Sequence, residues 1–190
     1  DPQPIISFND DGSLGLVLNP DGYKSIDDLA KDELRIAGTR LDPVRYTSSR
    51  MRYYKSFSLL ETKTGEEINI EYPDNGKFSF FQWSPNEEKI AFTNTTNKGV
   101  ELWVIDVNSG KSSKVIDTYV NDILNFPFLW FNSNNDLIVT LKCEVGKPEI
   151  SRTPSGPIIQ ETTNQNAPSR TYQDLIKNKN DELLFEHYAC

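Results

Sequence analysis

Short runs in which apolar and polar residues alternate, separated by turn-forming residues, fill the chain between 78 and 116. The clearest run, 100–106, carries apolar side chains on both faces of an extended strand, which predicts a strand that is covered on both sides. Turn-forming Ser, Pro, Asn and Gly separate it from its neighbours. Four antiparallel strands joined by short turns form one blade of a β-propeller. The predicted strands are 78–83, 89–93, 100–106 and 114–116.

A Trp-turn-strand pattern occurs twice, with an offset of about 47 residues that is typical of propeller blades. Trp83 precedes the apolar run 90–93, and Trp130 precedes the apolar run 137–140. A weaker copy begins at Phe8, and its predicted strands are 14–18, 51–61 and 67–71. Because a single blade cannot bury both of its faces, we expect both tryptophans to lie where adjacent blades meet. The pattern predicts a mainly β fold, a partial β-propeller of about two and a half four-stranded blades. A generic β-sandwich is the alternative.

Two segments have helical patterns. Residues 27–34 follow Ser25, a suitable N-cap, and predict a helical insertion near 25–35. Residues 144–167 are polar and rich in Pro and Gly, and 171–189 again carry a helical apolar stripe, with Ser169 as the candidate cap. We therefore expect propeller blades over 1–143. An irregular crossing and a helical segment should fill 144–190, the helix packing either on another domain or blade or on its own sheet.

The composition excludes several classes of protein. A net charge of −8 without a cluster of Lys and Arg argues against a nucleic-acid partner. No apolar stretch approaches the roughly 20 residues that a membrane-spanning helix needs. The chain begins at Asp1 without an initiator Met, so we expect it to be processed or a piece of a longer protein. Cys143 and Cys190 are too few for a disulfide framework, and Cys143 lies in an apolar run that predicts a small buried side chain. The pair leaves the redox compartment open.

A search for chemistry finds no catalytic motif. The sequence contains no GxSxG, and Ser112 and Ser113 lie in what reads as a hairpin turn. The one histidine, His187, is predicted to face solvent on the last helix, and one His with two distant Cys cannot form a His/Cys metal site. The acidic pairs at 10–11 and 27–28 lack the spacing of a calcium loop and are typical of turns. No phosphate-binding glycine loop is present, so we expect no cofactor and no metal.

A basic and aromatic segment at 45–55 is the remaining candidate site. Its cations could bind a carboxylate or a phosphate through charge-assisted hydrogen bonds, or they could form the outer face of a strand. The residues concerned are Arg45, Arg50, Arg52 and Lys55, together with Tyr46, Tyr53 and Tyr54.

Several segments together resemble the N-terminal propeller of the glutamyl endopeptidases, a branch of the prolyl oligopeptidase family of serine peptidases. The blade from WSP at 83–85 to ELWVID at 101–106 is similar to propeller repeats of that family in general. The more specific segments are LRIAGTRLDP at 34–43, SRMRYY at 49–54, APSRTYQDLIKN at 167–178 and DELLFEHYA at 181–189. The resemblance covers almost the whole chain.

The resemblance implies a parent enzyme with a C-terminal α/β-hydrolase domain that carries the Ser, Asp and His of a catalytic triad, none of which lies here. In such enzymes the propeller caps the active site and restricts access to peptides. The implied cleavage after Glu suggests that Arg40, Arg50 and Arg52 hold an acidic side chain of the peptide substrate. We therefore expect this chain to be the non-catalytic propeller segment of a serine endopeptidase, and not an enzyme by itself. The alternative is a stand-alone propeller-type protein-interaction module.

Two further expectations concern the behaviour of the chain. Unpaired strand edges and uncovered blade faces should make a partial propeller self-associate, or the chain should have a flexible tail from about Glu144 onward. For localisation, the resemblance fits an exported bacterial enzyme and an organellar enzyme equally well.

Overall fold

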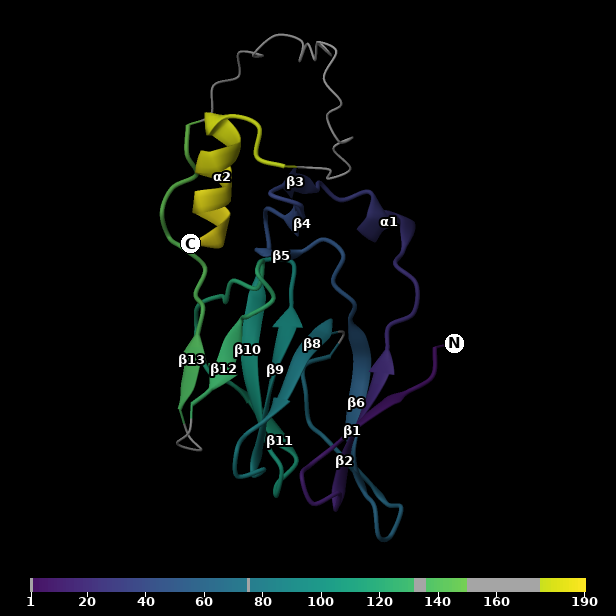
Figure 1. Ribbon diagram of the computed structural model, residues 1–190. Coiled ribbons are helices and arrows are strands. Elements are labelled where there is room, and N and C mark those ends of the chain that lie inside the picture. The colour runs from purple at the N-terminus through teal and green to yellow at the C-terminus, as the bar shows by residue number, and fades with distance from the viewer. Residues whose placement is uncertain (1, 75, 132–135, 150–174) are drawn as a thin grey trace, which may run out of the picture.

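The computed structural model describes residues 2–74, 76–131, 136–149 and 175–190. Antiparallel strands predominate over helices, and a smaller layer with two helices covers one end of the large sheet (Figure 1). The predicted mainly β class is therefore confirmed. No helix within these residues is long and apolar enough to cross a membrane.

The large sheet consists of two four-stranded antiparallel units, and a separate two-stranded hairpin follows it along the chain. The first blade pairs β1 (Ile5–Phe8), β2 (Leu14–Pro20), β6 (Tyr54–Glu61) and β7 (Glu67–Asn69) in that order. The second blade pairs β8 (Phe78–Trp83), β9 (Lys89–Thr95), β10 (Val100–Asp106) and β11 (Lys111–Lys114). The hairpin pairs β12 (Phe128–Trp130) with β13 (Leu137–Val139). This succession of meanders is the arrangement of a partial propeller. The number of two and a half blades stays a prediction.

The apolar cores lie between these units, as expected for blades that bury each other's faces. The core between the first and second blades contains Phe57 and Phe92, with Trp83 packed against it. The core between the second blade and the hairpin contains Leu102 and Trp130. Both tryptophans therefore lie between adjacent units, as predicted. β10 contributes to both cores, which confirms that this strand is covered on both faces.

The strand that closes the second blade differs from its prediction. It runs over Lys111–Lys114 and not over 114–116, because the turn through Gly110, at φ 67°, lets pairing with β10 begin at once. Ser112 and Ser113 consequently lie on this strand and not in the hairpin turn. Apolarity was a poor guide here, since an edge strand is held by backbone pairing while its side chains stay at least partly exposed.

An insertion, residues 21–53, separates β2 from β6. It contains α1 (Ile26–Leu29) and a three-stranded sheet of β3 (Leu34–Ile36), β4 (Thr39–Asp42) and β5 (Thr47–Ser48). Ser25 caps α1 as predicted, accepting a hydrogen bond from the Asp28 amide at 3.1 Å. The predicted helix over 27–34 is too long, however. Leu34 already pairs with Leu41 in the small sheet, where Ile36 and Leu41 are buried.

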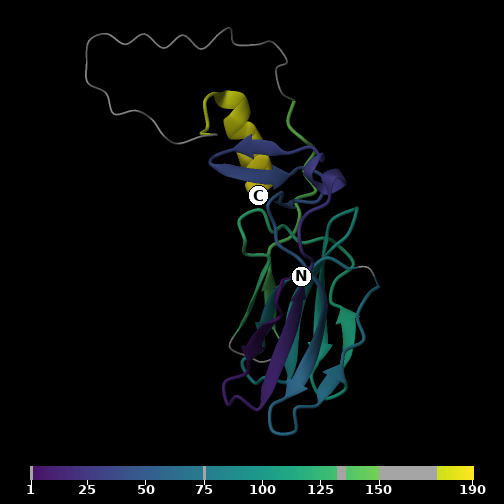
Figure 2. The ribbon, with the colours of Figure 1, turned by 90° about the vertical axis from the view of Figure 1, so that its right-hand side faces the viewer.

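The last helix, α2 (Lys179–Ala189), packs on this insertion (Figures 1 and 2). It begins after Asn178, whose side chain accepts a hydrogen bond from the Asp181 amide at 2.9 Å. The predicted helix over 171–189 is therefore too long, because residues 175–177 precede α2 and are not helical. Residues 171–174 and the proposed cap Ser169 lie outside the described residues.

Helix α2 covers the small sheet of the insertion. Leu184 and Tyr188 are buried against the small sheet of the insertion, so the helix packs within its own chain. The final residues therefore do not form the flexible tail that we expected. A boundary between two parts at residue 143 stays a prediction, as does self-association.

Candidate binding cleft

A cavity of about 1360 Å³ lies between the insertion and the adjoining ends of the two blades. Pro20 at the end of β2, Tyr54 at the start of β6 and Lys77 just before β8 form its blade side. The insertion supplies most of the rest. Seven Lys or Arg and five Asp or Glu line the cavity, although the whole chain carries a net charge of −8. The cleft is thus richer in cations than the molecule around it.

Glu33 gathers the arginines of the insertion. Its carboxylate lies 2.9 Å from Arg35 Nε, 3.4 Å from Arg40 Nη1 and 3.5 Å from Arg50 Nε. The Ser49 hydroxyl donates to the same carboxylate at 2.5 Å. This hydrogen bond, followed by the neighbouring arginines, lowers the pKa of Glu33. Arg40 and Arg50 therefore already share a carboxylate partner within the chain.

Asp28 holds the lysines on the other side of the cleft. Its carboxylate lies 2.5 Å from Lys31 Nζ and 2.9 Å from Lys77 Nζ. These two ammonium groups, Lys31 first, lower the pKa of Asp28. The contact with Lys77 also links α1 to the second blade.

Two cations of the cleft have no carboxylate within salt-bridge distance in the described part of the chain. The half-buried Lys24 ammonium donates a hydrogen bond to the Ser49 carbonyl oxygen. Burial lowers the pKa of Lys24, and the charges of Arg50 and Lys77 lower it further, partly against the pull of Asp28. Arg52 lines the cleft, is exposed, and makes no hydrogen bond or ion pair with the described residues.

The predicted site residues are brought together only in part. Arg45, Arg50 and Arg52 line the cleft, whereas Arg40 reaches its edge through Glu33. Arg45 pairs with Asp42 at 3.3 Å and lies in the turn between β4 and β5. None of the three arginines of the basic segment, Arg45, Arg50 and Arg52, lies on a strand, so the alternative of a strand's outer face is wrong for them. A substrate-binding role for Arg40, Arg50 and Arg52 stays a prediction.

Sequence reasoning missed Lys24, Glu33 and Lys77. Lys24 and Lys77 are far apart in the sequence and approach each other only because the insertion folds back over the start of β8. Glu33 lay inside the segment that we predicted to be helical. No local pattern marks these residues as neighbours.

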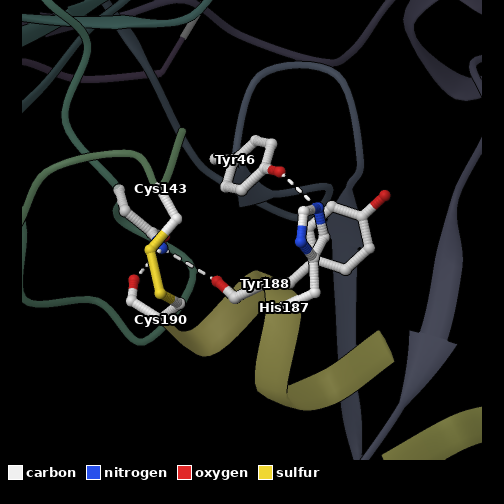
Figure 3. The surroundings of a disulfide bond; sticks show 6 residues. Tyr46, Cys143, His187, Tyr188 and Cys190 are labelled. Carbon is white, nitrogen blue, oxygen red and sulfur yellow. Dashed lines mark hydrogen bonds between the residues drawn. A yellow bond between two sulfur atoms is a disulfide. The ribbon is translucent and has the colours of Figure 1, made fainter. Parts of the chain in front are cut away.

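Cys143 and Cys190 form a disulfide, with 6.0 Å between their Cα atoms (Figure 3). The prediction that Cys143 is a small buried apolar side chain is therefore wrong. The Asn121 amide lies beside this bond and donates to the backbone carbonyls of Tyr188 and Cys190, at 2.8 and 3.0 Å. The bond and the amide together fix the C-terminal end of α2.

His187 is half-buried, and its ring nitrogen Nε2 lies 2.8 Å from the Tyr46 hydroxyl (Figure 3). The expectation of a solvent-facing histidine is wrong, since the insertion covers this side of α2. Burial, followed by the nearby Lys147 and Lys142, lowers the pKa of His187. The Lys142 ammonium also lies 4.3 Å from the centre of the Tyr46 ring.

The remaining carboxylate pairs have structural explanations. Asp11 accepts a hydrogen bond from the Ser13 amide at 2.8 Å in a turn where Gly12 has a φ of 69°. Asp28 is occupied by lysines, as described above. No group of three or more His, Cys, Asp or Glu side chains suited to a metal occurs in the part of the chain that the structure covers.

Comparisons with known proteins place this fold in context. No protein-family model matches the chain. A protein of Oryza sativa subsp. japonica named "Probable glutamyl endopeptidase, chloroplastic" is 32% identical over 205 aligned positions, which include 99% of this chain. The chain is a homologue of one part of the glutamyl endopeptidases. A protein of Arabidopsis thaliana with the same name is 30% identical, again over 99% of this chain.

These relatives are far longer than the chain, which spans 22% and 21% of their lengths. The two matches confirm the resemblance to glutamyl endopeptidases that the sequence motifs indicated. Among solved structures, a Bacteroides ovatus protein assigned as a dipeptidyl aminopeptidase IV has a TM-score of 0.38 and 15% identity. It covers 61% of this chain and 18% of its own. This likeness is too low to support a structural argument.

Proposed function

We propose that the chain is the non-catalytic propeller segment of a serine endopeptidase of the prolyl oligopeptidase type, and that it caps the active site and limits substrate access. The observation that carries this proposal is homology to glutamyl endopeptidases over 99% of a chain without a GxSxG motif and with a single His. Chemistry must then come from a separate domain, for which a C-terminal α/β-hydrolase domain is the natural partner. Fold alone does not carry activity.

The cleft gives this segment a means to contact substrate. Arg50 and Arg52 line it, and Arg40 forms an ion pair with Glu33, which also lines it. Guanidinium groups recognise carboxylates through paired, charge-assisted hydrogen bonds. The proposed role of these three arginines is to hold an acidic side chain of the peptide that the hydrolase domain cleaves.

The full-length protein tests the capping role. We expect it to cleave short Glu-containing peptides and to lose that activity with a serine-directed inhibitor, while this chain alone is inactive. Replacing residues 21–53 by a short Gly-Ser linker should raise the ratio of kcat/KM for folded protein substrates to kcat/KM for short peptides, even though it also removes Arg40, Arg50 and Arg52 and so lowers cleavage of both. Equal size selection by the two proteins would contradict the capping role, and a parent without a GxSxG motif would favour the interaction module.

Single substitutions test the arginines. In the full-length enzyme, Arg40→Ala, Arg50→Ala and Arg52→Ala should each lower kcat/KM for Glu peptides relative to matched Gln peptides. Unchanged ratios for all three would rule out their role in substrate binding.

A further inference from the structure

Seven Lys or Arg and five Asp or Glu line the cleft, which leaves an excess of two positive charges. Around the carboxylates of Asp28 and Glu33 lie six cations, five of which share these two carboxylates as ion-pair partners. The six cations are Lys24, Lys31, Arg35, Arg40, Arg50 and Lys77. A concave site with an excess of one sign of charge concentrates ligands of the opposite sign. This excess stands out more because the whole chain is acidic.

Lys24 is the one of these six cations that has no carboxylate within salt-bridge distance in the described part of the chain. Within the described residues, its half-buried ammonium donates only to the Ser49 carbonyl oxygen. Asp28 and Glu33 attract it from beyond salt-bridge distance, Arg50 and Lys77 repel it, and burial still lowers its pKa. A partly desolvated ammonium of this kind would gain free energy from an anion in direct contact. Arg52, which has no partner among the described residues, lines the same cleft. An added carboxylate would relieve both groups.

We propose that the cleft contains a carboxylate-binding subsite whose principal ligand is Lys24, with Arg50 and Lys77 beside it and Arg52 on the same wall. The subsite deepens the proposed function, on which its assignment to a peptide carboxylate rests. Lys24 thereby becomes a specificity-determining residue that the basic segment at 45–55 did not include.

A peptide can present this carboxylate in two ways, as an acidic side chain or as a free C-terminus. A peptide cut after Glu carries both at its new end, so the same subsite would also retain that product. Three N-acetylated tripeptides separate the sources. Two are C-amidated, with a central Glu or a central Gln between alanines, and the third is trialanine with a free C-terminal carboxylate.

The experiment is calorimetric titration of these peptides into the full-length protein, with the hydrolase nucleophile replaced by Ala where it is present. We expect the Glu peptide to bind at least about tenfold more tightly than the Gln peptide, the worth of a charge-assisted hydrogen bond. Lys24→Met should abolish this preference, and Lys24→Arg should retain most of it. Lys63→Met, in the exposed turn between β6 and β7, is the matched control and should change nothing.

The outcomes are distinct. Tight binding of free-carboxylate trialanine, with no preference for Glu over Gln, would assign the subsite to the C-terminus. A Glu preference that survives Lys24→Met would overturn the subsite, even if the enzyme cleaves after Glu. A Lys24-dependent preference in a protein without peptidase activity would keep the subsite and overturn the proposed function.

Discussion

At the scale of single residues, Asp122 is the most unusual group in the structure. It is fully buried, and neither carboxylate oxygen has a hydrogen-bond partner in the described part of the chain. The Thr47 hydroxyl lies nearby but outside hydrogen-bond geometry, and Asp42 acts on Asp122 as a charge of the same sign. Burial above all raises the pKa of Asp122 to about 7. The Asp122 amide meanwhile donates to the Tyr46 carbonyl at 3.0 Å, so this residue joins the insertion to the blades.

A pH-dependent stability follows from Asp122. The pKa is about 7 in the folded chain and 3.8 for the free group, so folding favours the protonated form. Its contribution is most favourable below pH 4 and is lost as the pH rises to about 7, by up to about 4 kcal/mol. Asp122→Asn should flatten the dependence of the free energy of unfolding on pH between 4 and 7 and raise Tm at pH 8. Denaturant unfolding over this range measures the effect.

The control for this prediction is Asp117→Asn, which removes an exposed carboxylate. It should leave the pH profile of the free energy of unfolding unchanged. Parallel profiles for wild type and Asp122→Asn would show that Asp122 does not titrate in this range.

At the scale of elements, the sequence predicted the bounds of the second blade's strands more accurately than those of the two helices. The bounds of β8 and β10 were predicted to the residue, because alternation on two covered faces leaves a strong local signal. The predicted lengths of α1 and α2 were wrong, because Leu34 pairs with Leu41 in the small sheet and α2 begins only after its N-cap at Asn178. Local propensity does not contain such tertiary contacts.

The candidate site was harder to predict than the fold. Arg50 and Arg52 were found because they lie in one basic segment, whereas Lys24 and Lys77 come from segments that only the folded chain brings together. The disulfide was missed for the same reason. Its cysteines are 47 residues apart, and nothing around either one indicates the other.

The disulfide should control how firmly α2 is held. The double variant Cys143→Ser, Cys190→Ser opens a loop of 47 residues, whose closure is worth about 4 kcal/mol in the chain-entropy description. We expect amide hydrogen exchange to increase most in α2, which opens locally, and less in β9 and β10, which exchange only when the blades unfold. The helix should remain in place because Leu184 and Tyr188 still pack on the insertion. Reduction of the wild type should reproduce the pattern, and slow exchange in α2 after reduction would refute it.

At the scale of the whole molecule, the two blades and the hairpin pack on one another in the same way, face to face. Each interface between neighbours uses one face of each sheet, and the second blade is covered on both faces. The hairpin is covered on one of its two faces only. Phe128 and Trp130 face the second blade, while the cross-strand pair Leu129 and Ile138 on the opposite face is 56% exposed at each residue. Relatives of which this chain spans about a fifth have ample sequence for a further blade.

The outer face of the hairpin therefore should be covered in the full-length protein and uncovered in this chain. The variant Leu129→Asp, Ile138→Asp should leave Tm of the 190-residue chain unchanged and suppress any self-association, measured by sedimentation. In the full-length protein it should lower Tm by several degrees, because two carboxylates would be buried without partners. Val44→Asp, at an exposed position of the insertion, should affect neither protein. If the full-length variant is as stable as wild type, no further blade packs on this face, and the propeller does not continue from this side of the hairpin.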